Sequence, residues 1–240
     1  MQACIIVPCF NEEKRISSDS FIKFSNDNDH ISFIFVNDGS TDNTNEVLTH
    51  ITTESPKNSF IKLSHNQGKA AAVRAGMLLA HQKGFTHIGY LDADLTIPLE
   101  TAKGLIRSLD EKKVDFVFAS RTKRFKRQKG QSLFRQTIGH SFSLLSRTIL
   151  QMPIKDTQCG AKFFRSTNVP VLFEAPFMSK WIFDVEIFFR FKEHHHGNVK
   201  TNFFEYPLDY WEDNHDSKVK FMDYVKVPYT LMSIFIYYRT

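Results

Sequence analysis

Residues 31–42 read ISFIFVNDGSTD, a mostly apolar run followed at once by amide, carboxylate and glycine residues that favour turns. Residues 3–13, ACIIVPCFNEE, and residues 87–94, HIGYLDAD, have the same form. Short β-branched or aromatic runs that end in turn residues are typical of strands. These stretches therefore predict three strands, each with polar side chains directly after it.

The first half of the chain repeats this pattern, with helical spacing between the apolar runs. A helix is predicted over Gly68 to Lys83, and another is predicted to begin near Pro98. The predicted strands are Ala3–Val7, Ile31–Val36, Phe60–Leu63, His87–Leu91 and Val114–Ala119. Strands that alternate with helices predict an α/β fold, with a mostly parallel, Rossmann-like sheet flanked by helices.

Beyond about residue 120 the alternation stops. An amphipathic pattern covers residues 133–150, and residues 228–238 form a short apolar segment rich in tyrosine. Each fits either a helix packed on the sheet or a helix at a membrane interface. The longest uncharged stretches hold eleven and twelve residues, too few to cross a bilayer. We expect one domain over residues 1–220, with a C-terminal amphipathic or apolar helix over residues 221–240.

The positive charge of the chain is concentrated in one segment. With 31 Lys and Arg against 26 Asp and Glu the net charge is +5, yet residues 116–151 contain no acidic residue. The basic residues of this segment are Arg121, Lys123, Arg124, Lys126, Arg127, Lys129, Arg135 and Arg147. An anionic partner fits such a segment, and so does a solvated surface. We expect no nucleic acid there, because the segment matches no recognised motif and the acidic strand ends would repel a polyanion.

The overall composition is that of an ordinary globular protein. The chain is 42% hydrophobic and 24% charged, which disfavours disorder and coiled coil. Its three cysteines include no C-x-x-C pair, which favours a reducing compartment. No N-terminal targeting segment is recognisable. These features predict a cytoplasmic protein, with peripheral association with the membrane left open.

Polar side chains at the strand ends are the candidates for chemistry, because ligands of open parallel sheets bind there. Asp92 and Asp94 repel one another unless a cation joins them, and such oxygen ligands suit Mg²⁺ or Mn²⁺ held with substrate phosphates. Lys69, at the start of a predicted helix, favours a phosphate. Surface acids, turns and helix caps remain the ordinary interpretations. The chain has neither a Walker A loop nor G-x-G-x-x-G.

Taken as a set, the motifs are similar to those of the family 2 glycosyltransferases of GT-A fold. They are VPCFNEE at 7–13, VNDGSTD at 36–42, NQGKAAAVRAG at 66–76, DADLT at 92–96 and ASR at 119–121. Later motifs, DTQCGAK at 156–162, WIFDVE at 181–186 and the stretch from Glu205 to Lys218, most resemble the dolichyl- or polyprenyl-phosphate sugar synthases, especially the glucosyltransferase branch. The resemblance covers about residues 4–220 and implies a GT-A fold.

On the donor side, the resemblance implies a nucleoside-diphosphate sugar, with UDP-glucose favoured. The residues implied in binding the base and ribose are Pro8, Asn11, Glu12 and Asp38. Lys69 is implied to lie near the polar edge of this nucleotide pocket. Asp92 and Asp94 match the family's D-x-D motif, in which the second acid helps to hold Mg²⁺ or Mn²⁺ against the diphosphate. A cleft between Asp94 and Asp38 is therefore expected.

On the acceptor side, the resemblance implies a polyprenyl or dolichyl phosphate, or another anionic acceptor. Arg121 would face the reacting phosphate, and Arg135 and Lys218 are further candidates for the same clamp. Gln158 and Lys162 belong to the family's acceptor-side and structural motif. Because a phosphate monoester is already ionised near pH 7, we expect a single inverting displacement at the anomeric carbon that needs no base.

A hydroxyl acceptor is the alternative. Asp184 matches the acid that serves as general base in relatives with hydroxyl acceptors, so a soluble or growing glycan would require Asp184 to remove a proton. A lipid-surface binding module without catalysis is a further alternative. Thr96 departs from the mannose branch, which commonly has glutamine there, and moves the match toward the glucose branch. Many relatives continue into transmembrane helices, and none is recognisable here, so we expect the basic segment and amphipathic helices to hold a lipid acceptor.

Overall fold

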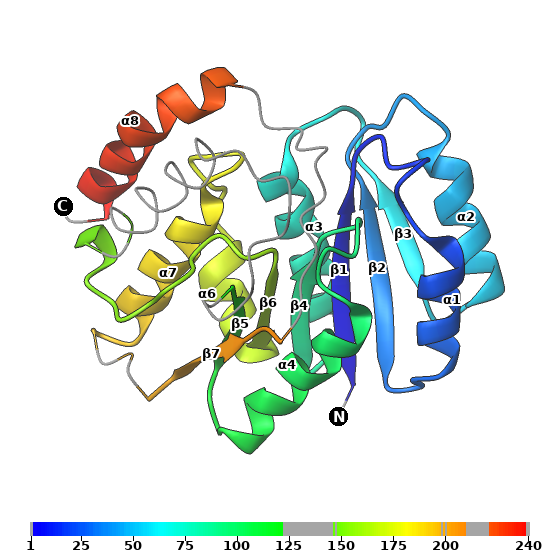
Figure 1. Ribbon diagram of the computed structural model, residues 1–240, viewed down its shortest axis with the longest axis horizontal. Coiled ribbons are helices and arrows are strands. Elements are labelled where there is room, and N and C mark those ends of the chain that lie inside the picture. Colours follow the sequence, from blue (N-terminus) through cyan, green and yellow to red (C-terminus); the bar gives the residue numbers. More distant parts are fainter. Residues whose placement is uncertain are drawn as a thin grey trace.

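The computed structural model of the chain describes residues 2–121, 148–197, 201–209 and 221–238, together with residues 146 and 199. Seven strands of this part form one sheet, in the order β3-β2-β1-β4-β6-β5-β7 (Figure 1). The strands are β1 (Ala3–Cys9), β2 (Ile31–Asn37), β3 (Ser59–Lys62), β4 (His87–Leu91), β5 (Phe116–Ser120), β6 (Ala161–Arg165) and β7 (Phe203–Pro207). The pairs β1-β2, β2-β3, β1-β4 and β5-β7 are parallel, so the predicted mostly parallel α/β sheet is confirmed.

Helices cover both faces of this sheet (Figure 1). The helices of one face are α3 (Lys69–Gln82), α6 (Val169–Phe173), α7 (Phe183–His194) and α8 (Phe221–Tyr237), with the short 3-10 turn η1 (Ser166–Asn168) before α6. The helices of the other face are α1 (Ser18–Asn26), α2 (Thr44–Glu54) and α4 (Leu99–Glu111). The predicted helices at 68–83 and after Pro98 are found as α3 and α4.

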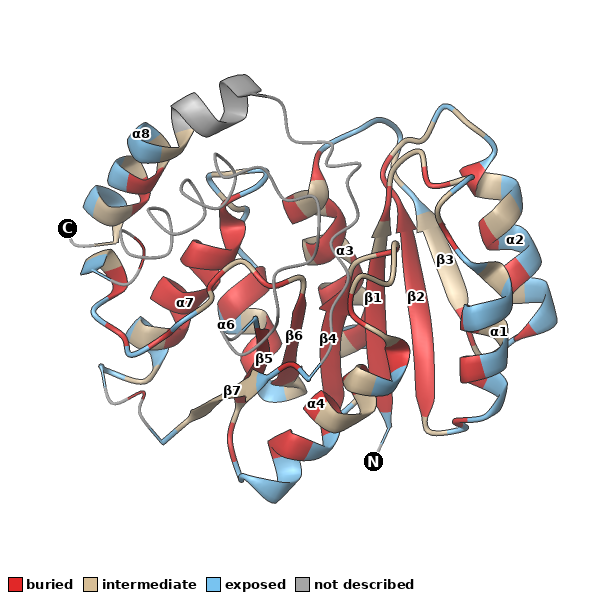
Figure 2. Cartoon of the chain, in the orientation of Figure 1, coloured by how far each residue is buried: buried red, intermediate tan, exposed pale blue. Residues whose placement is uncertain are grey.

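The central strands are apolar on both faces because each face has its own hydrophobic core. Successive side chains of a strand point to opposite faces. Ile6 and Ile34 accordingly pack in the core under α3, whereas Ile5 and Phe33 pack in the core under α1 and α4. Figure 2 shows the buried residues concentrated along these strands. This double burial explains why the strands read as continuous apolar runs in the sequence.

The sheet also contains two strands that the sequence did not predict. β6 lies between β4 and β5 and is antiparallel to both, and β7 pairs with β5 at the edge of the sheet. The strand predicted at Val114–Ala119 is found at Phe116–Ser120, and that predicted at Phe60–Leu63 is found at Ser59–Lys62. Because β6 runs in the opposite direction, its first residue lies at the edge where β4 and β5 end. The loop before β6 therefore reaches the edge that carries the polar strand ends.

The C-terminal helix is packed on one side and exposed on the other. Leu231 and Ile234 of α8 are buried, and the ring of Tyr238 stacks on that of Phe189 of α7, with 5.3 Å between ring centroids. On the outer side, Tyr229 is 78% exposed. The apolar segment predicted at 228–238 thus forms most of α8. The division of the chain into a domain over residues 1–220 and a separate C-terminal helix stays a prediction.

Two sequence predictions concern the membrane. The amphipathic segment predicted at 133–150 lies outside the described residues, except for 146 and 148–150. Among the helices that the structure describes, none is both long and apolar enough to span a bilayer.

Candidate active site

The loops that follow β1 and β2 hold each other in place. The amide of Asn11 donates to Ser40 Oγ (3.0 Å), and Asn11 Oδ1 accepts from the amide of Thr41 (2.9 Å). Asn11 has a φ of 51°, which asparagine tolerates better than most residues. The amide of Glu12 donates to Thr44 Oγ1 at 2.8 Å. The predicted residues Asn11 and Glu12 therefore lie at the edge of the sheet, beside the end of β2.

Asp38 directly follows β2 and is only 3% exposed. Its Oδ1 accepts from the amide of Gln67 (2.7 Å), and its Oδ2 accepts from the amide of Gly68 (2.8 Å). Gly68 has a φ of 98°, a conformation that favours glycine. Asp38 therefore fixes the loop in front of α3. Pro8, also predicted for the donor pocket, lies within β1 opposite Val36.

Lys69, the first residue of α3, reaches across to the end of β4. Its Nζ lies 2.5 Å from Asp92 Oδ1. Burial alone would lower the pKa of this ammonium, but the charges of Asp92, Asp184 and Asp94 raise the pKa above its ordinary value. Lys69 is therefore cationic at neutral pH. Through residues 67–69, the position of Asp38 is coupled to that of Asp92.

Asp94 is held from two directions. Its Oδ1 accepts from the amide (3.1 Å) and the hydroxyl (2.7 Å) of Thr96, and its Oδ2 lies 2.9 Å from Nη2 of Arg15. The guanidinium of Arg15 also lies 3.3 Å from a carboxylate oxygen of Glu12. Thr96 therefore orients the carboxylate of Asp94. Glu12, predicted as a nucleotide contact, is linked to Asp94 through Arg15.

Asp92 and Asp94 are suited to a divalent cation that a ligand helps to bind. Their side chains are 39% and 17% exposed, and both are anionic oxygen donors. In the part of the chain that the structure describes, no group of three or more His, Cys, Asp or Glu side chains converges into a metal site. Mg²⁺ is commonly held by one or two carboxylates plus substrate phosphates rather than by an all-protein cage. The two aspartates fit that arrangement, with Lys69 and Arg15 beside them as basic neighbours.

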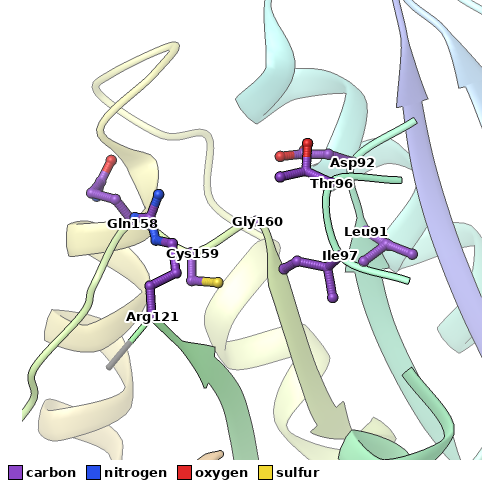
Figure 3. Close-up of a pocket in the computed structure, with 8 residues that line it drawn as sticks. All are labelled: Leu91, Asp92, Thr96, Ile97, Arg121, Gln158, Cys159 and Gly160. Atoms are coloured by element: carbon purple, nitrogen blue, oxygen red, sulfur yellow. The ribbon is translucent and has the colours of Figure 1, made fainter. Parts of the chain in front are cut away.

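A cavity of about 90 Å³ lies between the end of β4 and the loop before β6 (Figure 3). Asp92 and Thr96 line one side, and Arg121 and Gln158 line the other. Gly160 lies between them, and a Cβ at this position would come within 2.1 Å of Asp92 Oδ2. Gly160 therefore allows the Asp92 carboxylate to approach the loop before β6.

Arg121 directly follows β5 and is held by Asp156. Its Nε and Nη2 lie 2.7 and 3.0 Å from the two carboxylate oxygens, and its amide donates to Oδ2 at 3.1 Å. Asp156 also accepts from the amide of Gln158 at 3.1 Å. Burial alone would raise the pKa of Asp156, but the charge of Arg121 and these hydrogen bonds hold the pKa below its ordinary value. The pair thus presents an oriented guanidinium at the cavity.

Asp184 lies in a buried cluster rather than on the cavity wall. Its Oδ1 is 2.5 Å from Nζ of Lys162 and 2.5 Å from the hydroxyl of Tyr90. The Lys162 side chain is 0% exposed and also donates to the carbonyl of Cys159 at 2.8 Å. Burial and the charge of Asp184 together raise the pKa of Tyr90 well above its ordinary value. Asp184 therefore accepts hydrogen bonds from a buried ammonium and a buried phenol.

Most of the predicted residues that the structure describes lie at one edge of the sheet, at the ends of β1, β2 and β4 and the start of α3, with Arg121 and Gln158 across the cavity. Lys162 and Asp184 are buried instead, and Pro8 lies within β1. Arg135 and Lys218, the weaker candidates for the phosphate clamp, lie outside the described residues. Sequence reasoning missed Arg15, Tyr90 and the role of Gly160. Arg15 and Tyr90 contact aspartates that are 79 and 94 residues away, so no local spacing marks them. Asp156 was quoted within a motif, but nothing in the sequence paired it with Arg121.

The sequence of this chain is similar to those of known glycosyl transferases. The sequence model described as Glycosyl transferase family 2 matches residues 4–171. A dolichyl-phosphate beta-glucosyltransferase of Trichomonas vaginalis is 31% identical, over 98% of this chain and 71% of its own length. The enzyme of the same description from Dictyostelium discoideum is 27% identical, over 77% of this chain and 60% of its own length.

Solved structures resemble this fold at low sequence identity. Glucosyl-3-phosphoglycerate synthase of Mycobacterium tuberculosis, crystallised with Mn²⁺, UDP-glucose and phosphoglyceric acid, superposes with a TM-score of 0.71 at 17% identity. The match covers 98% of this chain and 79% of that structure. At 17% identity, this similarity shows a shared fold and nothing about the activity.

Proposed function

Because this chain belongs to glycosyl transferase family 2, we propose that it transfers glucose from UDP-glucose to a polyprenyl phosphate of the dolichyl type, with inversion at the anomeric carbon. The relatives described above carry the name dolichyl-phosphate beta-glucosyltransferase, which supports this donor sugar and this acceptor. The proposal includes a divalent cation, Mg²⁺ or Mn²⁺, held with the diphosphate by Asp92 and Asp94.

The observation that carries the proposal is the arrangement of charge around one cavity. Asp92, after the end of β4, lies on one side of the cavity, and the guanidinium of Arg121 lies on the other side (Figure 3). A guanidinium matches the geometry of a phosphate, which it can bind through two parallel hydrogen bonds. An acceptor phosphate bound to Arg121 would therefore face a sugar whose diphosphate is held near Asp92 and Asp94.

Unpartnered polar atoms near Arg121 support a polar ligand at this place. Ser120 Oγ, Thr157 Oγ1 and Gln158 Nε2 are buried and have no hydrogen-bond partner among the described residues. Buried polar groups usually have a partner, because an unmade hydrogen bond costs about 1–3 kcal/mol. Of these three residues Gln158 lines the cavity, so an anionic oxygen of the acceptor can accept a hydrogen bond from its Nε2.

The position of Asp184 favours a phosphate over a hydroxyl acceptor. A general base must come within hydrogen-bond reach of the proton it removes. Asp184 is 5% exposed, and both Lys162 and Tyr90 already donate to its Oδ1. A phosphate monoester, with its second pKa at about 6, arrives ionised and needs no such base.

The residues of the chain then have distinct tasks in a single displacement. Arg121 would orient the acceptor phosphate so that one of its oxygens attacks the anomeric carbon, while the bond from that carbon to the nucleoside diphosphate breaks. Lys69 would stabilise the departing diphosphate with its positive charge. Asp38 would keep Lys69 in place by fixing the loop before α3. A bound divalent cation would supply further charge neutralisation of the leaving group.

The direct test is transfer by the purified protein. Incubation with UDP-glucose, Mn²⁺ or Mg²⁺ and a short polyprenyl phosphate should give a lipid-linked glucose, detected by mass spectrometry. Polyprenol without the phosphate, and GDP-mannose as donor, serve as controls and should give little product. Asp94→Ala should lower kcat/KM by about 10²-fold to 10³-fold, as removal of one group that stabilises developing charge does elsewhere. No turnover with any nucleotide sugar, or full activity of Asp94→Ala, would contradict the proposal.

A pH-rate profile separates the phosphate acceptor from the hydroxyl acceptor. With a phosphate acceptor, the acidic limb should follow the ionisation of the phosphate and should be unchanged in shape in Asp184→Asn. With a glycan hydroxyl as acceptor and Asp184 as base, the same substitution should abolish that limb.

A further inference from the structure

Glu205 lies on β7, away from the cavity, and binds the backbone of the loop before β6. Its Oε1 accepts from the amides of Lys155 (2.9 Å) and Asp156 (3.1 Å), and its Oε2 lies 3.2 Å from the Lys155 amide. Two consecutive amides that converge on one carboxylate form an anion-binding turn. Glu205 therefore fixes the backbone position of Asp156.

Asp156 passes this constraint on to Arg121. Its carboxylate binds Nε, Nη2 and the amide of Arg121, so its position sets both the side-chain rotamer and the backbone end of β5. β7 runs parallel to β5, with Glu205 paired opposite Phe118, three residues before Arg121. The amide of Leu208 donates to the carbonyl of Ser120 at 3.0 Å, so the ends of β5 and β7 are joined as well.

A constraint of this kind matters because Arg121 is a long, partly exposed side chain. Its side chain is 39% exposed. Ordering a long side chain when a ligand binds costs affinity, and a side chain that is already ordered avoids this cost. The hydrogen bond from the Lys155 amide is exposed, so water could satisfy that amide as well, whereas the hydrogen bond from the Asp156 amide is partly buried. The particular consequence of the Glu205 carboxylate is therefore the fixed position of Asp156.

We infer that Glu205 is a positioning residue for the acceptor phosphate, which acts through Asp156 to hold the guanidinium of Arg121 in its binding orientation. The inference rests on the proposed transfer to a phosphate acceptor and adds a residue that touches neither substrate. Glu205 thus gives β7 a role in the affinity for the acceptor, whereas residues at the ends of β1, β2 and β4 would bind the sugar donor.

The test is a double-mutant cycle on acceptor affinity. Glu205→Ala should raise the KM for a short polyprenyl phosphate by about 3-fold to 10-fold, the cost of ordering one long side chain. The KM for UDP-glucose should stay within about twofold, because Glu205 binds the amides of Lys155 and Asp156, which lie on the Arg121 side of the cavity. Glu205→Gln, which keeps one acceptor oxygen for the two amides, should recover part of the loss. In an Arg121→Ala background, Glu205→Ala should have no further effect on the acceptor KM.

A matched control is Asp110→Ala. Asp110 is also a carboxylate in ion pairs near the sheet, with His87 and Arg165, but it lies at the end of α4, away from Arg121. Its removal should leave both KM values unchanged. Thermal unfolding of each variant shows that the folded state is retained, and Glu205→Gln carries the test if Glu205→Ala does not fold.

The outcomes distinguish this inference from the proposed function. If Glu205→Ala raises both KM values equally, or has the same effect with and without Arg121, Glu205 does not act through Arg121, although transfer to the phosphate still occurs. If the wild-type protein does not glycosylate a polyprenyl phosphate, the proposed function is wrong and the inference fails with it.

Discussion

Two Lys–Asp pairs in this protein have the same length and different surroundings. Lys69 Nζ lies 2.5 Å from Asp92, and Lys162 Nζ lies 2.5 Å from Asp184. The first pair has side chains that are 23% and 39% exposed, whereas those of the second are 0% and 7% exposed. A partly exposed pair can exchange its partner for a ligand, but a buried pair cannot separate without leaving an uncompensated charge. We therefore propose that the exposed pair serves ligand binding and that the buried pair serves the stability of the fold.

The sharpest test of this difference is Lys162→Met. It removes the ammonium and leaves the Asp184 carboxylate buried without its cation, so the free energy of unfolding should fall by about 3–5 kcal/mol. Denaturant titration followed by circular dichroism measures this change. Lys162→Met combined with Asp184→Asn should recover more than half of the loss, since the amide oxygen still accepts from Tyr90. A loss below about 1 kcal/mol in the single variant would show that the cluster is not a structural ion pair.

Lys69→Met should lower activity strongly and change stability little. The free energy of unfolding should change by about 1 kcal/mol or less, because the pair is partly exposed. The value of kcat/KM for the nucleotide sugar should fall by roughly 10²-fold, since a positive charge near the leaving diphosphate is lost. Steady-state kinetics with UDP-glucose, beside the same denaturant titration, give both values. A large loss of stability without a loss of activity would reverse the assignments of the two lysines.

Gly160→Ala tests whether the loop before β6 constrains the exposed pair. The new methyl group would fall within 2.1 Å of Asp92 Oδ2, so the carboxylate must move. We expect activity to fall by about tenfold, with a stability loss of about 1–3 kcal/mol from crowding. Gly84→Ala is the control, because Gly84 has a φ of 82° but no neighbour within 4 Å of its added Cβ. That control should lose a similar amount of stability and keep its activity, and equal activities in the two variants would contradict the expectation.

The smallest effect is expected in how steeply the free energy of unfolding declines at acid pH. The pKa of Asp156 is held below its ordinary value, so its contribution to stability is present above the unfolded pKa of about 3.9 and is lost as pH falls through the folded pKa. Denaturant titrations between about pH 5 and pH 2.5 should therefore show a steeper decline for the wild type than for Asp156→Asn. Parallel declines would mean that the ion pair with Arg121 adds nothing to stability.

The N-terminal half of the fold could be predicted because each signal is local. The runs before Asn11, Asp38 and Asp92 are apolar on both faces, and polar residues follow them directly, so strand and strand end are both visible in the sequence. The parallel arrangement of strands then brings these side chains to one edge. The strands β6 and β7 lack such local signals and were not predicted. β6 carries Lys162 within its run, and a buried lysine does not read as part of a core strand until its partner Asp184 is known.

The sequence by itself determined the α/β class and the edge of the sheet at which Asp38, Lys69, Asp92 and Asp94 lie. Only the tertiary structure decided which charges meet: Arg15 with Asp94, Asp156 with Arg121, and Lys162 with Asp184. The physical reason is that strand formation depends on neighbouring residues along the chain. The strength and use of an ion pair depend instead on burial, and burial is set by segments such as β6 and α7 that the sequence places far apart.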